Sequence, residues 1–185
     1  MRLIPMLALL AVACTQAAAP SAEERSSGRD QVTAKGRPID GDTVSIDVRL
    51  FGADAFEKRQ LCRNADGCWQ CGKAAQDYAS RLLKGGNANI TMTGKQSYGR
   101  PVGTVTIGGH DLGEAMIEAG FALPATDFLT ADPERATRYV AAYDRAVSRH
   151  AGAHAGFFIE PAKWRRGERL SCEGRARDDR GDRGR

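Results

Sequence analysis

Apolar and polar residues alternate over a short stretch in the first third of the chain. In "PIDGDTVSIDVRLFGADAFE", residues 38–57, the apolar positions are Val44, Ile46, Val48 and Leu50. A period of two is typical of a half-buried strand. The same stretch holds five acidic residues and one arginine, although acids are disfavoured in strands. The pattern therefore predicts strands whose ends carry carboxylates.

Helical periodicity begins after a polar, cysteine-bearing segment predicted as a loop over residues 57–71. Apolar residues at helical spacing predict a helix over about residues 73–84, ended by the glycine pair at 85–86. "NITMTG" and "RPVGTVTIGG" follow and are predicted to be strands.

Two further helices have clear start signals. Asp111 can cap a short helix that stops at Gly120, with Glu114 as the other half of a capping box. The pair Asp132-Pro133 opens a long helix that extends to near residue 149. The order of strands, helix, strands, short helix and long helix predicts a small α+β domain, with a partly open barrel and helices packed against it.

Composition agrees with one soluble domain and two tails. The chain has 185 residues, of which 42% are hydrophobic and 27% charged, enough for one domain with a core. The net charge of +4 only weakly favours a polyanionic partner. We predict a linker over residues 20–31, a domain over 32–166 and a disordered charged tail over 167–185.

The N-terminus is predicted to be a signal peptide, residues 1–19. After Met1-Arg2 comes "LIPMLALLAVA", an apolar run too short to span a bilayer and typical of a signal-peptide core. Two forms of processing are open. Small residues before Cys14 resemble a bacterial lipoprotein signal, which would attach the protein to a membrane through a lipid on Cys14. Cleavage after Ala19 would give a periplasmic or secreted protein.

Export changes the interpretation of the cysteines. Four remain after Cys14, and an even count in an oxidising compartment predicts disulfides. We favour Cys62–Cys71, which closes a local loop, with Cys68–Cys172, which ties down the C-terminal segment. The alternative is a zinc site, because Cys68 and Cys71 have C-x-x-C spacing and Cys172 could supply a further thiolate.

The carboxylates near the predicted strand ends suggest a cation site. Asp42 lies in the "DGDT" corner and Asp54 just past "VRLFG". If these ends meet, they form half of a site for a hard cation such as calcium. Glu57 could then reach a water molecule as a general base, and Arg49 could pair with phosphate oxygens.

Three motifs resemble the signatures of the staphylococcal nuclease (thermonuclease) family. They are "IDGDTV", "VRLFGADAFE" and "SYGRPVGTV", and the resemblance extends to "GFFIEPAKWR", covering about residues 32–166. It implies a five-stranded oligonucleotide-binding barrel with three helices. It also implies calcium-dependent cleavage of DNA and RNA that leaves 3′-phosphates.

The resemblance also implies roles for individual residues. The calcium ligands would be Asp42, Asp54 and the backbone carbonyl of Ala55, with Asp40 as an acid beside them. Glu57 matches the general base.

The remaining matches concern the substrate. Arg49 and Arg100 match two arginines that clamp the phosphate and stabilise its developing charge. Tyr98 would lie in the nucleotide pocket, and Phe128 could stack on a base.

The chain departs from the family pattern in places. Asp42 and Asp54 are twelve residues apart, about 40 Å in one extended strand. To share an ion they need a hairpin, with its turn expected near residues 46–47, where there is neither Gly nor Asn. Phe56 replaces the family's proline before the base, Thr126 replaces a stacking tyrosine, and His154 stands where the family often has tryptophan.

Three functional hypotheses follow. The first is an exported, calcium-dependent, monomeric nuclease that acts on DNA and RNA. The second is a non-catalytic domain of the same fold that binds nucleic acid or protein in the envelope. The third is a cysteine-stapled structural protein of the envelope, which would not bind calcium.

Overall fold

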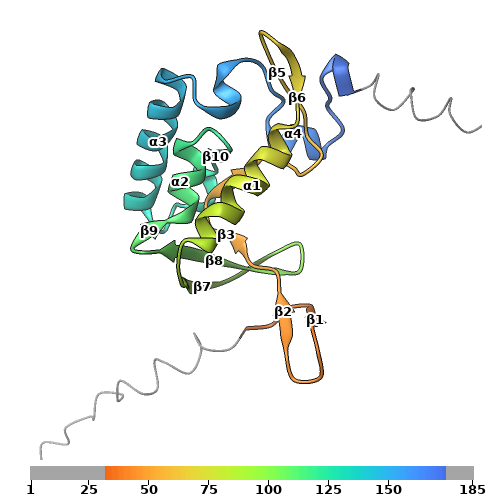
Figure 1. Ribbon diagram of the computed structural model, residues 1–185. Helices are drawn as coiled ribbons and strands as arrows, with labels where there is room; N and C mark the ends of the chain where they lie inside the picture. Colours follow the sequence, from red (N-terminus) through yellow and green to blue (C-terminus); the bar gives the residue numbers. More distant parts are fainter. Residues whose placement is uncertain (1–31, 174–185) are drawn as a thin grey trace, which may run out of the picture. The chain divides into compact units, whose positions relative to one another are not determined.

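The computed structural model describes residues 32–173 as an α+β arrangement of small sheets and helices (Figure 1). The predicted signal peptide, Cys14, the linker and residues 174–185 lie outside the described part. No helix between residues 32 and 173 is long and apolar enough to cross a membrane.

The largest sheet contains four strands. β3 (Arg49–Leu50) runs parallel to β8 (Arg100–Ile107), and β7 (Ala88–Ser97) pairs with β8 in the antiparallel direction. β9 (His110–Asp111) also pairs with β8, and β4 (Ala53–Ala55) pairs separately with β10 (Ala122–Pro124).

Two hairpins complete the strands. One joins β1 (Gly36–Pro38) to β2 (Val44–Ile46), and the other joins β5 (Cys62–Asn64) to β6 (Gly67–Trp69). The second hairpin occupies the segment predicted as a loop. Within residues 32–173 the strands form open sheets and not a closed barrel.

The turn predicted near residues 46–47 is wrong. The chain turns at residues 39–43, where the Ile39 N–H donates to the Thr43 carbonyl at 2.9 Å. "DGD" supplies residues that favour turns, whereas "IDV" does not. The chain then passes from β2 to β3 without reversing, and the β1–β2 hairpin extends away from the helices (Figure 1).

The predicted helices are present. α1 (Cys71–Lys84) begins two residues earlier than predicted, α2 (Leu112–Glu118) is short, and α3 (Pro133–Ser148) is long. Asp111 caps α2 by accepting from the Glu114 N–H at 3.0 Å, and Asp132 caps α3 in the same way through the Arg135 N–H. The Glu114 side chain, in contrast, pairs with Arg138 of α3.

The core lies where α1, α2 and α3 meet the strands, and it includes the fully buried Ile117, Leu129 and Tyr139. The Tyr139 hydroxyl donates to the Asp111 carboxylate at 2.8 Å, which connects α3 to the start of α2. Burial, followed by the charge of Asp111, raises the pKa of Tyr139. Tyr139 therefore stays a neutral donor in the core.

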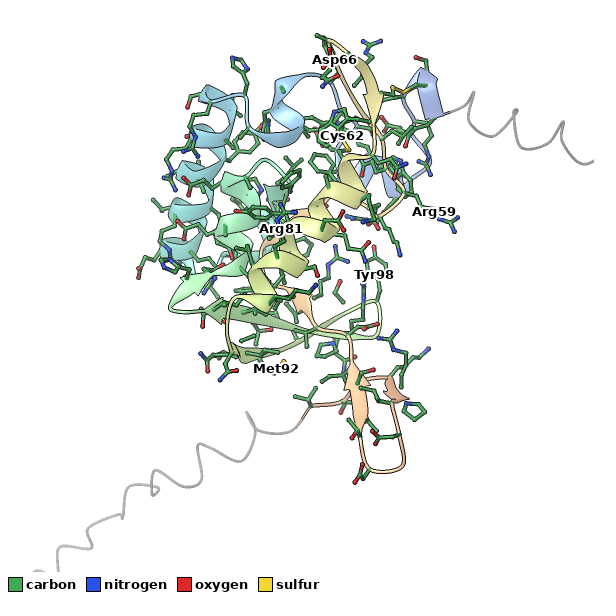
Figure 2. The ribbon with its side chains drawn as sticks, viewed as in Figure 1. Arg59, Cys62, Asp66, Arg81, Met92 and Tyr98 are labelled. Atoms are coloured by element: carbon green, nitrogen blue, oxygen red, sulfur yellow. A yellow bond between two sulfur atoms is a disulfide. The ribbon has the colours of Figure 1, made fainter. Side chains whose placement is uncertain are left out.

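The structure contains the two disulfides that we favoured. Cys62 is bonded to Cys71 and Cys68 to Cys172, with Cα–Cα distances of 5.5 and 6.5 Å (Figure 2). Residues 32–173 contain no cysteine cluster that could hold a metal, so the zinc alternative is not supported there.

The second disulfide places the domain boundary later than residue 166. Glu173 accepts from the Leu61 N–H at 2.9 Å and from Trp164 Nε1 at 2.8 Å. Residues 167–173 therefore pack with the domain, because Cys172 and Glu173 fasten them to it.

Candidate active site

A pocket of about 510 Å³ lies beside the β3–β4 turn. Its walls come from that turn, the end of β7, the segment after β10 and the short helix α4 (Pro161–Arg165). Gly52, at φ 75°, makes the turn that brings β4 alongside the pocket, and Leu129 packs directly over it. The side chains that matter most for chemistry are Arg49, Asp54, Lys95, Tyr98, Phe128 and Arg165.

Arg49 and Asp54 lie together, as the sequence suggested for a phosphate and cation site. Arg49 Nη2 donates to Asp54 Oδ1 at 3.1 Å. The Asp54 side chain is only 17% exposed. In a setting so little exposed, both charges need partners.

Arg165 of α4 is the second partner of Asp54. Its Nη1 donates to Asp54 Oδ1 and its Nη2 to Asp54 Oδ2, each at 2.8 Å. Nη1 also donates to Glu57 Oε1 at 3.0 Å. These bonds, the one to Asp54 foremost, raise the pKa of Arg165 above its usual range despite partial burial. One guanidinium thus bridges the predicted metal ligand and the predicted base.

Arg165 was not among the site residues predicted from the sequence. Its only signal was its position in "GFFIEPAKWR", which resembles the C-terminal half of the family domain. The partners, 108 and 111 residues away, have no local signature.

Glu57 is fixed through its backbone. Its N–H donates to the buried Gln60 side chain at 3.1 Å, and its carbonyl lies against Gly72 at the start of α1. Phe56, in place of the family's proline, is buried edge-on against Phe158 with centroids 5.1 Å apart. Glu57 does not itself line the pocket but contacts Arg165, which does.

Two exposed aromatic rings lie at the pocket. Tyr98 is 86% exposed and Phe128 67% exposed. Tyr98, labelled in Figure 2, has φ 52° in the β7–β8 turn. Its ring centroid lies 5.9 Å from the Arg49 guanidinium carbon. Exposed rings beside cations suit the stacking of a base next to a bound phosphate. Thr126, by contrast, does not line the pocket.

The structure does not bring Asp42 to Asp54. Asp42 lies in the exposed turn of the β1–β2 hairpin, whereas Asp54 lies on β4, which pairs with β10. Figure 1 shows that turn and β10 at opposite sides of the large sheet. Asp40 caps the turn by accepting from the Asp42 N–H, and its bond to Thr43 is the main cause of its lowered pKa.

Arg100 also lies outside the pocket wall. It is exposed at the first position of β8, across from Ser97 in the hairpin. Its role as a phosphate clamp stays a prediction.

The residues in this arrangement do not fit a calcium ion. Calcium takes six to eight oxygen ligands. Only Asp54 and Glu57 come together here, and both Asp54 oxygens already face guanidinium groups. Residues 32–173 contain no cluster of three His, Cys, Asp or Glu side chains that could hold a metal. The backbone carbonyl of Ala55 would add one oxygen, which does not complete the six to eight ligands of calcium.

The comparison with known proteins agrees with two of the three motifs, "VRLFGADAFE" and "SYGRPVGTV", whereas "IDGDTV" lies before the matched residues. A family model described as "Staphylococcal nuclease homologue" matches residues 47–153, which is more than half of the 185 residues. The match includes Arg49, Asp54 and Glu57, whereas Asp42 and Arg165 lie outside it. No curated protein matches the sequence at a significant level.

Proposed function

Since the chain belongs to the staphylococcal nuclease homologue family, we propose that it is a hydrolase that cleaves phosphodiester bonds of DNA and RNA. One observation supports this above the others. The pocket combines Arg49 and Asp54 of the family match with the exposed rings of Tyr98 and Phe128. Such a pocket has groups for a phosphate and for its neighbouring base.

Binding is assigned to the cations and the rings of the pocket. Arg49 can pair with two phosphate oxygens in a fork, and Lys95 adds a point charge on the same wall. Tyr98 and Phe128 would stack on bases without reading their identity, because every base has a π-face. The proposal therefore includes little base specificity.

Glu57 is assigned the proton transfer. It takes a proton from a water molecule while the water oxygen bonds to phosphorus. The bond from phosphorus to the 5′ oxygen breaks, and this oxygen takes a proton from solvent, which leaves a 3′-phosphate. Arg165 engages Oε1 of Glu57, so Oε2 is the atom assigned to the transfer. Arg49 stabilises the negative charge that develops on the phosphorus oxygens.

Calcium, which the family resemblance implies as a cofactor, has no step assigned to it. The arrangement of Asp42, Asp54 and Ala55 does not form its site, and the steps above use only groups of the chain. The calcium requirement is therefore a variable of the experiment.

We also propose that the protein is exported in a bacterium and acts as a monomer. The apolar run before Cys14 supports export, and the two disulfides suit an oxidising compartment. Lipid attachment at Cys14 would keep the protein at the envelope, and plain cleavage would leave it periplasmic or secreted.

The test is cleavage of single-stranded DNA, double-stranded DNA and RNA by the disulfide-intact full chain, with calcium and with chelator. We expect Glu57→Gln to lower the rate at least about a hundredfold, because general-base catalysis contributes that much. Glu134→Gln, at an exposed position of α3, is the matched control and should leave the rate unchanged. No cleavage by folded wild-type protein would contradict the proposal and favour a non-catalytic domain that binds nucleic acid or protein.

A further inference from the structure

We infer that Arg165 is the resident cation of the Asp54–Glu57 carboxylate pair, and that it occupies the position that a divalent cation would need there. The inference concerns a residue outside the family match. It adds to the proposed function a reason why these two acids stay together without a metal.

The first argument is geometric. Arg165 Nη1 and Nη2 contact the two oxygens of Asp54 as a fork, and Nη1 also reaches Glu57. A bidentate arginine–carboxylate pair is among the strong charge-assisted contacts in proteins. Because Arg165 engages both Asp54 oxygens, a cation must compete with this guanidinium for the carboxylate.

The second argument is electrostatic. Arg165, Asp54 and Glu57 are 30%, 17% and 37% exposed, so solvent screens their charges only in part. Two carboxylates that share one guanidinium would repel each other if the guanidinium were removed. The pair would then favour another cation. Arg49 contacts only Oδ1 of Asp54 and leaves Glu57 uncompensated.

The third argument is the anchoring of α4. Pro161 is fully buried, and the Trp164 indole donates to Glu173, next to the Cys68–Cys172 disulfide. Arg169 stacks on the Trp164 ring with its guanidinium carbon 3.8 Å from the centroid. These contacts hold the backbone of α4 in place, so the position of Arg165 is built into the fold.

The test measures calcium binding by the full chain in the absence of nucleic acid. Calorimetry gives the dissociation constant, and the calcium-dependent shift of the thermal unfolding midpoint is the second readout. We expect weak binding by wild-type protein and at least about a tenfold lower dissociation constant for Arg165→Gln, because the carboxylates lose their cation. Arg165→Lys keeps a charge but not the fork, and it should fall between the two. Unchanged or weaker calcium binding by Arg165→Gln would overturn the inference.

Two further variants localise the effect. Asp54→Asn combined with Arg165→Gln should lose the added calcium binding, because the pair no longer exists. Arg166→Gln removes an adjacent, exposed charge that forms no ion pair within residues 32–173, and this variant should bind calcium as wild type does. Retention of tight binding in the double variant would also overturn the inference. The calcium-binding measurement contains no nucleic acid, so its outcome does not depend on whether the protein cleaves nucleic acid.

Discussion

His154 is a histidine packed between aromatic rings. The rings of Tyr143 and Phe158 lie edge-on to it, with centroids 5.0 and 5.4 Å away. Its Nε2 is buried and has no hydrogen-bond partner among the described residues. Burial lowers the pKa of His154 below its usual 6.5, because the charged form would lose solvation. The native state therefore holds this imidazole neutral.

A pH dependence of stability follows. Between 6.5 and the lowered native pKa, the unfolded chain binds a proton that the native chain does not. The free energy of unfolding should therefore fall as the pH drops through 6.5, and this loss should stop below the native pKa. We expect His154→Phe to reduce the decrease in stability measured by denaturant unfolding between about pH 7.5 and about pH 5.5.

The control for this experiment is His110→Gln, which removes an exposed histidine on β9. It should keep the wild-type pH dependence. An equal decrease in wild type and His154→Phe would show that His154 does not cause it.

At the scale of the secondary-structure elements, the start of α1 determines where Glu57 lies. A Cβ added at Gly72 would lie 1.7 Å from the Glu57 carbonyl oxygen and 2.6 Å from its carbon. These are backbone atoms, so they cannot rotate away as a side chain would. The Gly72 N–H also donates to the Gln60 carbonyl at 3.1 Å, which holds the segment from Glu57 to Gln60 on the helix.

We expect Gly72→Ala to destabilise the protein although it lies in a helix. Alanine improves helix propensity by about 1 kcal/mol. Overpacking typically costs about 1–3 kcal/mol and shifts the backbone, so the clash should win and should also displace Glu57.

The measurement is the free energy of unfolding together with the cleavage rate. Gly86→Ala is the matched control, because its nearest contact would be an ordinary 3.8 Å to Ile107. A Gly72→Ala variant as stable and active as Gly86→Ala would contradict the close approach of α1 and Glu57.

The elements differ in how far the sequence predicts them. The starts of α2 and α3 could be predicted from Asp111 and Asp132, because a capping residue bonds to a backbone N–H within three residues. The β1–β2 turn was placed wrongly because the alternation from Val44 to Leu50 is the same whether the chain turns at residues 39–43 or 46–47. In the structure the local turn preference of "DGD" decides.

Contacts between charged residues of the site were predictable where the residues lie close in sequence. Arg49, Asp54 and Glu57 share one motif, and the structure joins Arg49 to Asp54. Arg165 reaches Asp54 across 111 residues, and no local pattern encodes such a contact. The expected meeting of Asp42 with Asp54 depended on a hairpin that forms elsewhere.

At the scale of the whole molecule, the Cys68–Cys172 disulfide connects two distant parts of the chain. The two cysteines are 104 residues apart, whereas Cys62 and Cys71 are nine apart. Cross-linking stabilises mainly by limiting the unfolded chain, and the effect grows with the length of the closed loop. The long link should therefore contribute more through chain entropy than the short one.

We expect the Cys68→Ser/Cys172→Ser variant to unfold with about 2–5 kcal/mol less free energy than wild type, in the range for a native disulfide. Denaturant unfolding measures this. Limited proteolysis should cut the variant earlier near residues 167–173, because Glu173 would no longer be held beside Leu61 and Trp164. Wild-type protein with reductant is the comparison, although it also loses Cys62–Cys71. Equal stability and equal proteolysis would mean that the contacts of Glu173 alone hold the C-terminal segment, and that α4 keeps Arg165 on Asp54 without the covalent link.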